Sequence, residues 1–204
     1  MYRLIFKLFI FLLFININFL FSDVKNPVDV LKNINKDILT IVDKNINLVD
    51  EKLNELLGEY IIPYINFDEM CLFIVGKGIW KNLSIDKKND FIYEFKKLVI
   101  KTYSTTLNKY IRSKVIFFEN KNFDNQNVQY GRKIQISIEI ETIEKGKNLH
   151  VDYRMIFYKD SWKLYDLIIE GISILKGFQA QFGNDIKKNG IDFVINRMKQ
   201  HNSG

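Results

Sequence analysis

Few side chains in this 204-residue chain have the types and spacing that acid, base or nucleophilic chemistry requires. Of the two histidines, His150 falls on the polar face of a predicted strand and His201 lies near the C-terminus. Neither is tied by spacing to a nucleophile, so both are interpreted as solvated surface residues. The sequence also has no phosphate-binding glycine loop, no G-x-S-x-G elbow and no H-E-x-x-H helix. No catalytic residue and no cofactor is therefore assigned from these motifs.

Asp166 is the strongest remaining candidate for a general base. Alternation along a predicted strand places it on the same face as Glu170. At about 3.3 Å per residue, their Cα atoms would lie roughly 13 Å apart. That separation exceeds the one used by the paired carboxylates of glycosidases. A small enzyme that acts on an apolar substrate, with Asp166 as its base, stays open as an alternative function.

The surroundings of Asp166 favour a structural role. Strict alternation places it on the same strand face as Trp162, Leu164 and Ile168, where an unpaired carboxylate would be costly. The carboxylate therefore needs a partner such as Arg154 or a helix N-terminus. Structural pairing is the favoured interpretation of this residue.

Composition narrows the class of protein further. Apolar residues make up 47% and aromatic residues 14%, which is enough for a sizeable core and excludes general disorder. The single cysteine, Cys71, excludes a disulfide framework and a multi-cysteine zinc site, and its apolar surroundings predict an inert core thiol. The net charge of +6 comes mostly from lysine, so no nucleic-acid partner is expected. One cysteine and two histidines offer few metal ligands, so no metal site is expected either.

The N-terminus has the features of an export signal. Arg3 and Lys7 precede Leu8–Phe21, a segment that is apolar except for two asparagines. A segment of this length matches a secretory signal core better than a spanning helix, which needs roughly 20 apolar residues. We therefore predict an export signal at residues 1–22 and a single domain at residues 23–204, with an uncleaved membrane anchor as the alternative.

The remaining chain changes from helical to strand periodicity. Three helical segments are predicted, the first as one long helix or two: Pro27–Tyr60, Asp68–Val75 and Ser84–Tyr110. Four strands then follow: Val115–Phe118, Ile134–Ile140, Leu149–Phe157 and Trp162–Ile172. A last helical segment begins near Leu175 and is broken at Asn189-Gly190. Because tight connections join successive strands, the sheet is expected to be antiparallel and the fold to be α+β.

The apolar faces of these elements leave two interpretations open. Aromatic residues gather in the helical segment Phe91–Tyr110 and in the strands between Tyr153 and Tyr165. They could fill an ordinary core, or the helix stripe and the sheet face could leave a cavity for an apolar ligand. Composition alone does not separate these two possibilities.

Three segments resemble one known family. Tyr60–Met70 and Val75–Trp80 match a pattern of Pro, a Phe-centred acidic step and then Gly and Trp. The strongest match is Trp162–Ser173, which resembles the pattern W-K-V-Y-D-V-x-I-E-G-V-S. A helix between them carries the matching apolar residues Phe91, Phe95, Tyr103, Leu107 and Tyr110. Over about residues 28–200, the chain resembles the MlaC (toluene-tolerance) family of periplasmic phospholipid-binding proteins.

This resemblance implies a fold, a cargo and partners. It implies helices packed on a twisted antiparallel sheet in an NTF2-like cone, with an apolar pocket between sheet and helices. It implies a periplasmic carrier of diacyl phospholipid, with no enzymatic activity, that maintains outer-membrane lipid asymmetry. Its partners would be an outer-membrane lipoprotein complex and the lipid-binding subunit of an inner-membrane ABC transporter.

The predicted pocket lining takes apolar residues from both the helices and the strands. These residues are Phe67, Met70, Trp80, Phe95, Val99, Tyr103, Leu107, Tyr110, Ile134, Ile136, Ile138, Tyr153, Met155, Trp162, Leu164 and Ile168. One departure from the family lies beyond this set: Gln179 stands where the family usually carries an arginine. An arginine that served partner docking or an ion pair would be lost or replaced at this position.

Overall fold

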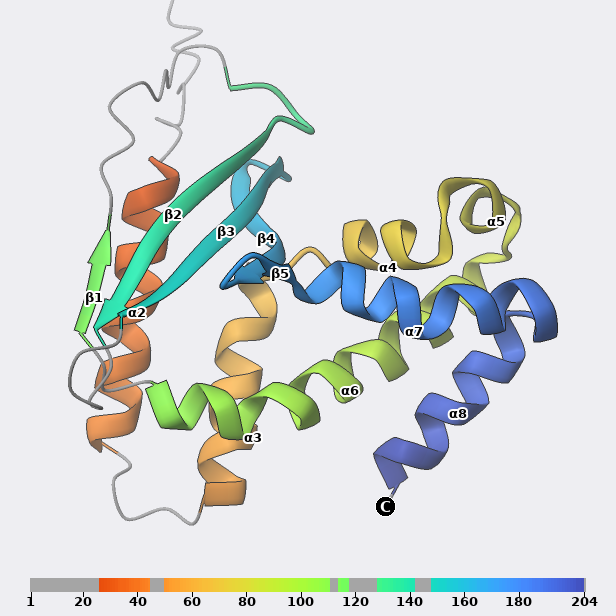
Figure 1. Ribbon diagram of the computed structural model, residues 1–204, viewed down its shortest axis with the longest axis horizontal. Coiled ribbons are helices and arrows are strands. Elements are labelled where there is room, and N and C mark those ends of the chain that lie inside the picture. The colour runs from red at the N-terminus through yellow and green to blue at the C-terminus, as the bar shows by residue number, and fades with distance from the viewer. Residues whose placement is uncertain (1–25, 45–49, 111–113, 118–127, 142–147, 204) are drawn as a thin grey trace, which may run out of the picture.

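The computed structural model combines helices with one antiparallel sheet, which confirms the α+β prediction (Figure 1). It describes residues 26–44, 50–110, 114–117, 128–141 and 148–203, so the predicted export signal lies outside the described residues. The helical elements are α2 (Pro27–Lys44), α3 (Asp50–Ile61), η1 (Ile62–Tyr64), α4 (Phe67–Val75), α5 (Lys77–Asn82), α6 (Ile85–Tyr110), α7 (Ile174–Asn189) and α8 (Ile191–Ser203). The strands are β1 (Lys114–Phe117), β2 (Lys133–Glu141), β3 (Asn148–Tyr158), β4 (Ser161–Ile169) and β5 (Ile172–Ser173).

Short polar side chains cap the starts of two helices. The Ser84 hydroxyl accepts a hydrogen bond from the Lys87 N–H at 3.3 Å at the start of α6. The Asn66 side chain accepts one from the Glu69 N–H at 3.0 Å at the start of α4. These caps satisfy N–H groups that have no partner within the helix. Gly190, with φ of 82°, separates α7 from α8 at the predicted break.

Two helix boundaries differ from the prediction. The first helical region, predicted to run to Tyr60, ends one residue later at Ile61. Gly76 does end α4, yet Lys77–Asn82 forms the additional short helix α5, which the prediction lacks. A six-residue helix gives too short a periodic pattern to be recognised from spacing alone.

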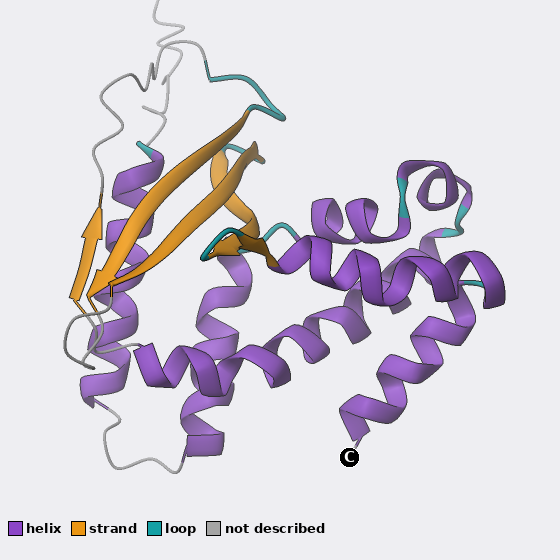
Figure 2. Ribbon diagram, in the orientation of Figure 1, coloured by secondary structure: helices purple, strands orange, loops and turns teal. Residues whose placement is uncertain are grey.

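The sheet has the order β1-β2-β3-β4-β5, and each neighbouring pair is antiparallel. Lys159 and Asp160 connect β3 to β4, with φ values of 48° and 57°. Positive φ at both central residues is typical of a type I′ turn, whose twist matches that of the paired strands. The predicted antiparallel pairing of successive strands is therefore confirmed (Figure 2).

Buried apolar residues form two clusters. The first, which we call the helical core, joins α4, α6, α7 and α8; Phe91, Phe95 and Cys71 within it have no solvent exposure. Cys71 thus lies in the core as predicted, and burial raises the pKa of its thiol well above the ordinary value. The second cluster joins α2 to one face of the sheet. The helices of the first cluster extend to one side of the sheet in Figure 1, where α4 and α7 run side by side.

The close approach of α3 to α6 depends on Gly58. A Cβ atom at this position would lie 2.8 Å from Cγ2 of Ile100, whose β-branched side chain has few alternative rotamers. We expect Gly58→Ala to lower the free energy of unfolding by about 1 kcal/mol, because an overpacking cost of about 2 kcal/mol outweighs the helix-propensity gain of about 1 kcal/mol. Thermal unfolding monitored by circular dichroism would measure this change.

Gly177 in α7 is the matched control, because a Cβ there meets no atom within 4 Å. Gly177→Ala should raise the melting temperature through helix propensity alone. Equal stabilisation by both substitutions would contradict the proposed role of Gly58 as a contact point.

Candidate binding site

One face of the sheet is formed almost entirely by apolar side chains. Register pairs Tyr153 with Ile136 on one side and with Leu167 on the other, and directly opposed residues share a face. We call this surface the inner face. It comprises Ile134, Ile136, Ile138, Ile140, Leu149, Val151, Tyr153, Met155, Phe157, Trp162, Leu164, Leu167 and Ile169.

Helix α2 covers only part of the inner face. Val28 and Leu31 of α2 pack into the cluster that contains Ile136, Ile138 and Met155, and all five are buried. Other inner-face residues stay half-buried: Ile134, Ile140, Leu149, Tyr153, Leu164, Leu167 and Ile169. An apolar surface therefore remains partly accessible between the sheet and the helices that pack on it.

A β-bulge in β4 determines which residues reach the inner face. Arg154 pairs with Asp166, whereas Met155 pairs with Leu164, so Tyr165 is an extra residue in β4. Beyond this point the side chains of β4 exchange faces. The prediction that Asp166 and Ile168 share a face with Trp162 and Leu164 is therefore wrong: the bulge moves both to the opposite, outer face.

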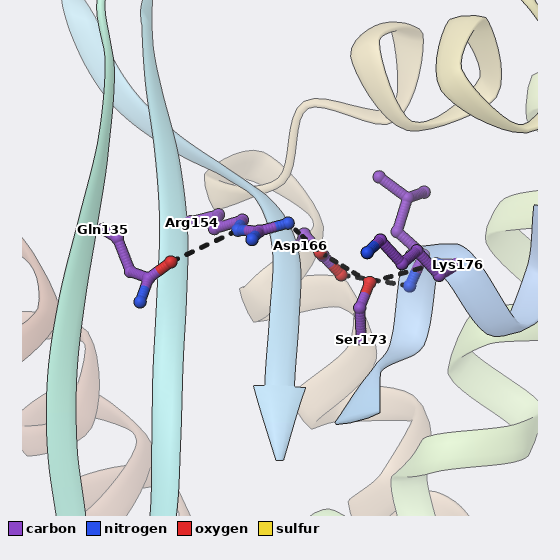
Figure 3. Close-up of polar contacts among 6 residues, drawn as sticks. Gln135, Arg154, Asp166, Ser173 and Lys176 are labelled. Carbon is purple, nitrogen blue, oxygen red and sulfur yellow. Dashed lines mark hydrogen bonds and ion pairs between the residues drawn. The ribbon is translucent and has the colours of Figure 1, made fainter. Parts of the chain in front are cut away.

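The outer face holds a polar network centred on Asp166, which is 2% exposed (Figure 3). Its carboxylate accepts hydrogen bonds from the Ser173 hydroxyl at 2.8 Å, the Leu175 N–H at 3.0 Å and Arg154 Nη1 at 3.3 Å. Ser173 also caps α7, because its hydroxyl accepts a bond from the Lys176 N–H at 3.0 Å. The predicted partners of Asp166, Arg154 and a helix N-terminus, are thus both confirmed.

This geometry makes Asp166 a structural connection between the sheet and α7. In Figure 3 the carboxylate lies between Arg154 on the sheet side and Ser173 at the start of α7. The Arg154 Nε also contacts Gln135 on β2 at 3.4 Å, which extends the network across three strands. Because Asp166 is engaged by three donors, the geometry does not favour a role as a free base.

The structure divides the predicted pocket residues between distinct environments. Seven lie on the inner face: Ile134, Ile136, Ile138, Tyr153, Met155, Trp162 and Leu164. Phe67, Met70 and Phe95 belong to the helical core, and Trp80 and Val99 pack against it. Tyr103, Leu107 and Tyr110 are on α6, but their side chains lie outside the described part of the chain.

The sequence prediction missed several members of the apolar cluster at the sheet. Leu167 and Ile169 were missed because the bulge reverses the alternation on which the prediction relied. Leu149 and Val151 had the right alternation and could have been included. Val28 and Leu31 show helical spacing in the sequence, but spacing does not reveal which element a helix contacts.

The described residues also form an open cavity of about 310 Å³ between α4, α5 and the ends of β2 and β3. Its lining includes Trp80, Tyr130 and Tyr158, together with Lys133 and Glu69, which form an ion pair. No inner-face residue takes part in this lining. This cavity is therefore distinct from the predicted space between the sheet and helices.

Comparison with known proteins identifies the family. The family model described as MlaC protein matches residues 32–200. The chain belongs to the MlaC family. Two relatives of this MlaC-family chain are an intermembrane phospholipid transport system binding protein from Haemophilus influenzae (23% identical) and toluene tolerance protein ttg2D from Pseudomonas putida (24%). Each match covers 72% of this chain, but only 67% and 64% of the relatives' lengths.

A solved structure supports the fold of this MlaC-family chain. It is a phospholipid-binding protein from Ralstonia solanacearum in complex with a phospholipid, with a TM-score of 0.70 at 20% sequence identity. The match covers 85% of this chain and 94% of the other. At this level of identity the similarity establishes a shared fold.

The described residues of this MlaC-family chain contain neither a membrane-spanning helix nor a metal-binding cluster. No described helix is long and apolar enough to cross a membrane. In the same ranges, no group of three or more His, Cys, Asp or Glu side chains is arranged to hold a metal ion.

The structural role of Asp166 can be tested by removing its charge. Asp166→Asn removes the negative charge that strengthens these hydrogen bonds, and it places an amide NH₂, itself a donor, against other donors. The free energy of unfolding should therefore fall by about 2–4 kcal/mol. Chemical denaturation would measure the loss.

Asp185→Asn provides a matched control on α7, because Asp185 pairs with Arg197 where the two side chains are 27% and 40% exposed. Its effect should stay below about 1 kcal/mol, since solvent screens this pair. Similar small losses in both variants would contradict the anchoring role of Asp166.

Proposed function

We propose that this MlaC-family protein carries a diacyl phospholipid with its acyl chains held against the inner face of the sheet. The observation that supports this proposal most directly is the incomplete cover of the inner face by α2, which leaves Ile140, Leu149 and Leu167 half-buried. The relatives from H. influenzae and P. putida are named for phospholipid transport and toluene tolerance, and the solved Ralstonia protein holds a phospholipid. The function that we propose for this chain, carriage of a phospholipid, agrees with these names.

The energetics of lipid transfer explain why the site should be apolar and free of reactive groups. Two chains of roughly 14 methylenes each, at about 0.8 kcal/mol per methylene, would cost on the order of 20 kcal/mol to expose to water. A carrier avoids this cost only if its interior solvates the chains as a bilayer does. Transfer is then nearly neutral in free energy, and direction comes from the partners rather than from chemistry on the lipid.

The proposed cellular role follows the family. We propose that residues 1–22 direct export, that residues 23–204 act as one lipid-binding domain, and that the protein works in the periplasm. It would exchange phospholipid with an outer-membrane lipoprotein complex and with the lipid-binding subunit of an inner-membrane ABC transporter. No bound metal or cofactor and no nucleic-acid partner is part of this proposal. The name of the Haemophilus relative, an intermembrane transport binding protein, supports this role.

The alternative function, an enzyme with Asp166 as base, is less well supported. Such an enzyme needs a carboxylate that faces its substrate, whereas Asp166 lies on the outer face and accepts three hydrogen bonds. The observations therefore favour the carrier.

Native mass spectrometry of the protein, purified after expression in a bacterium, tests the carrier function directly. We expect a complex with co-purified diacyl phospholipid, because the apolar surface should retain lipid through purification. Protein that is lipid-free and cannot take up lipid from phosphatidylglycerol vesicles would contradict the proposal.

A substitution within the site should then remove the lipid without unfolding the protein. Leu167→Trp adds an indole to the half-buried part of the inner face, so the co-purified lipid should fall severalfold at little change in melting temperature. Ile172→Trp introduces the same side chain at a position that is 73% exposed, and it should leave lipid content unchanged. Equal lipid content in both variants would show that the inner face is not the lipid site.

A further inference from the structure

Tyr153 places a hydroxyl group at the centre of an otherwise apolar surface. It belongs to β3, the middle strand of the sheet (Figure 1). Its direct neighbours on the inner face are Ile136 and Leu167. The inner face has only one other polar side-chain group, the indole N–H of Trp162. A tyrosine here supplies no packing that phenylalanine would not also supply, so its hydroxyl needs a separate explanation.

Neighbouring atoms desolvate the Tyr153 hydroxyl, and no hydrogen bond joins it to another described residue. Burial alone raises its pKa to about 12, so the phenol stays neutral and can donate a hydrogen bond throughout the physiological pH range. The side chain is nevertheless half-buried, not fully enclosed. By contrast, Tyr60 donates to Asp37 at 2.6 Å on the protein surface.

A phospholipid brings a matching acceptor to this surface. Each ester carbonyl of a diacyl lipid accepts hydrogen bonds from water at the membrane interface and loses them when the lipid enters an apolar site. The acyl chains need no polar contact, so the Tyr153 hydroxyl, between its apolar neighbours Ile136 and Leu167, matches one carbonyl. Ether-linked lipids have the same chains and headgroup but lack this acceptor.

We propose that the Tyr153 hydroxyl donates a hydrogen bond to an ester carbonyl of the bound phospholipid, and that this bond makes the protein prefer ester-linked to ether-linked lipid. The inference rests on the proposed carrier function and adds a specificity-determining residue to it. Tyr153 acts here by pairing a carbonyl that would otherwise be buried without a partner.

A competition between two lipids in one vesicle tests this inference. Vesicles contain equal amounts of diester and diether phosphatidylglycerol with identical chains, and native mass spectrometry distinguishes the two complexes by mass. Wild-type protein should load the diester lipid in about three- to tenfold excess, the range expected for one net hydrogen bond. Tyr153→Phe should load the two lipids about equally, with its uptake of diether lipid unchanged.

Tyr158→Phe is the matched control, because Tyr158 is also on β3 but lines the separate cavity beside α4. It should keep the wild-type preference. No preference in the wild type, or the same preference in Tyr153→Phe, would overturn the inference while leaving the carrier function intact. An equal fall in the uptake of both lipids by Tyr153→Phe would overturn it as well, because the hydroxyl would then not distinguish the ester from the ether. Failure of wild-type protein to load either lipid would overturn the carrier function and this inference together.

Discussion

The arrangement of the molecule depends on the buried carboxylate of Asp166. It binds a guanidinium on the neighbouring strand, the hydroxyl that caps α7 and a backbone N–H of that helix. A buried charge is tolerated only when it is paired and hydrogen-bonded, so the strand and the helix are fixed in one relative position. Through this contact the sheet determines where α7 begins and hence where the helical core is built.

The bulge at Tyr165 makes that contact compatible with an apolar sheet face. Without the extra residue, alternation would direct Asp166 toward Trp162 and the inner face. With it, the carboxylate and the apolar surface lie on opposite sides of the same strand. The bulge is adjacent to Leu164, whose carbonyl accepts a hydrogen bond from the Asn66 N–H at 2.7 Å. One irregularity therefore separates the polar anchor from the proposed lipid site and joins β4 to the start of α4.

The sequence was sufficient to predict the parts of the fold that depend on local patterns. Alternating isoleucines predicted β2, Ser84 predicted the start of α6, and Asn189-Gly190 predicted the break between the last two helices. The faces of β4 could not be predicted, because no local pattern marks the bulge, which lies beside a bridge from Leu164 to Ile65, about 100 residues earlier in the chain. For the same reason, the residues predicted to line one pocket separate into the inner face and the helical core, since periodicity identifies apolar faces but not their partners.

The presence of two separate apolar clusters has a consequence for an empty carrier. The helical core is packed by its own aromatic rings, with Phe95 and Phe178 at 4.9 Å between centroids in an edge-to-face arrangement. None of the described residues that form the helical core or pack against it belongs to the inner face. We therefore expect the helical core to keep its shape whether or not cargo is present, so that filling and emptying the site change the packing on the inner face alone.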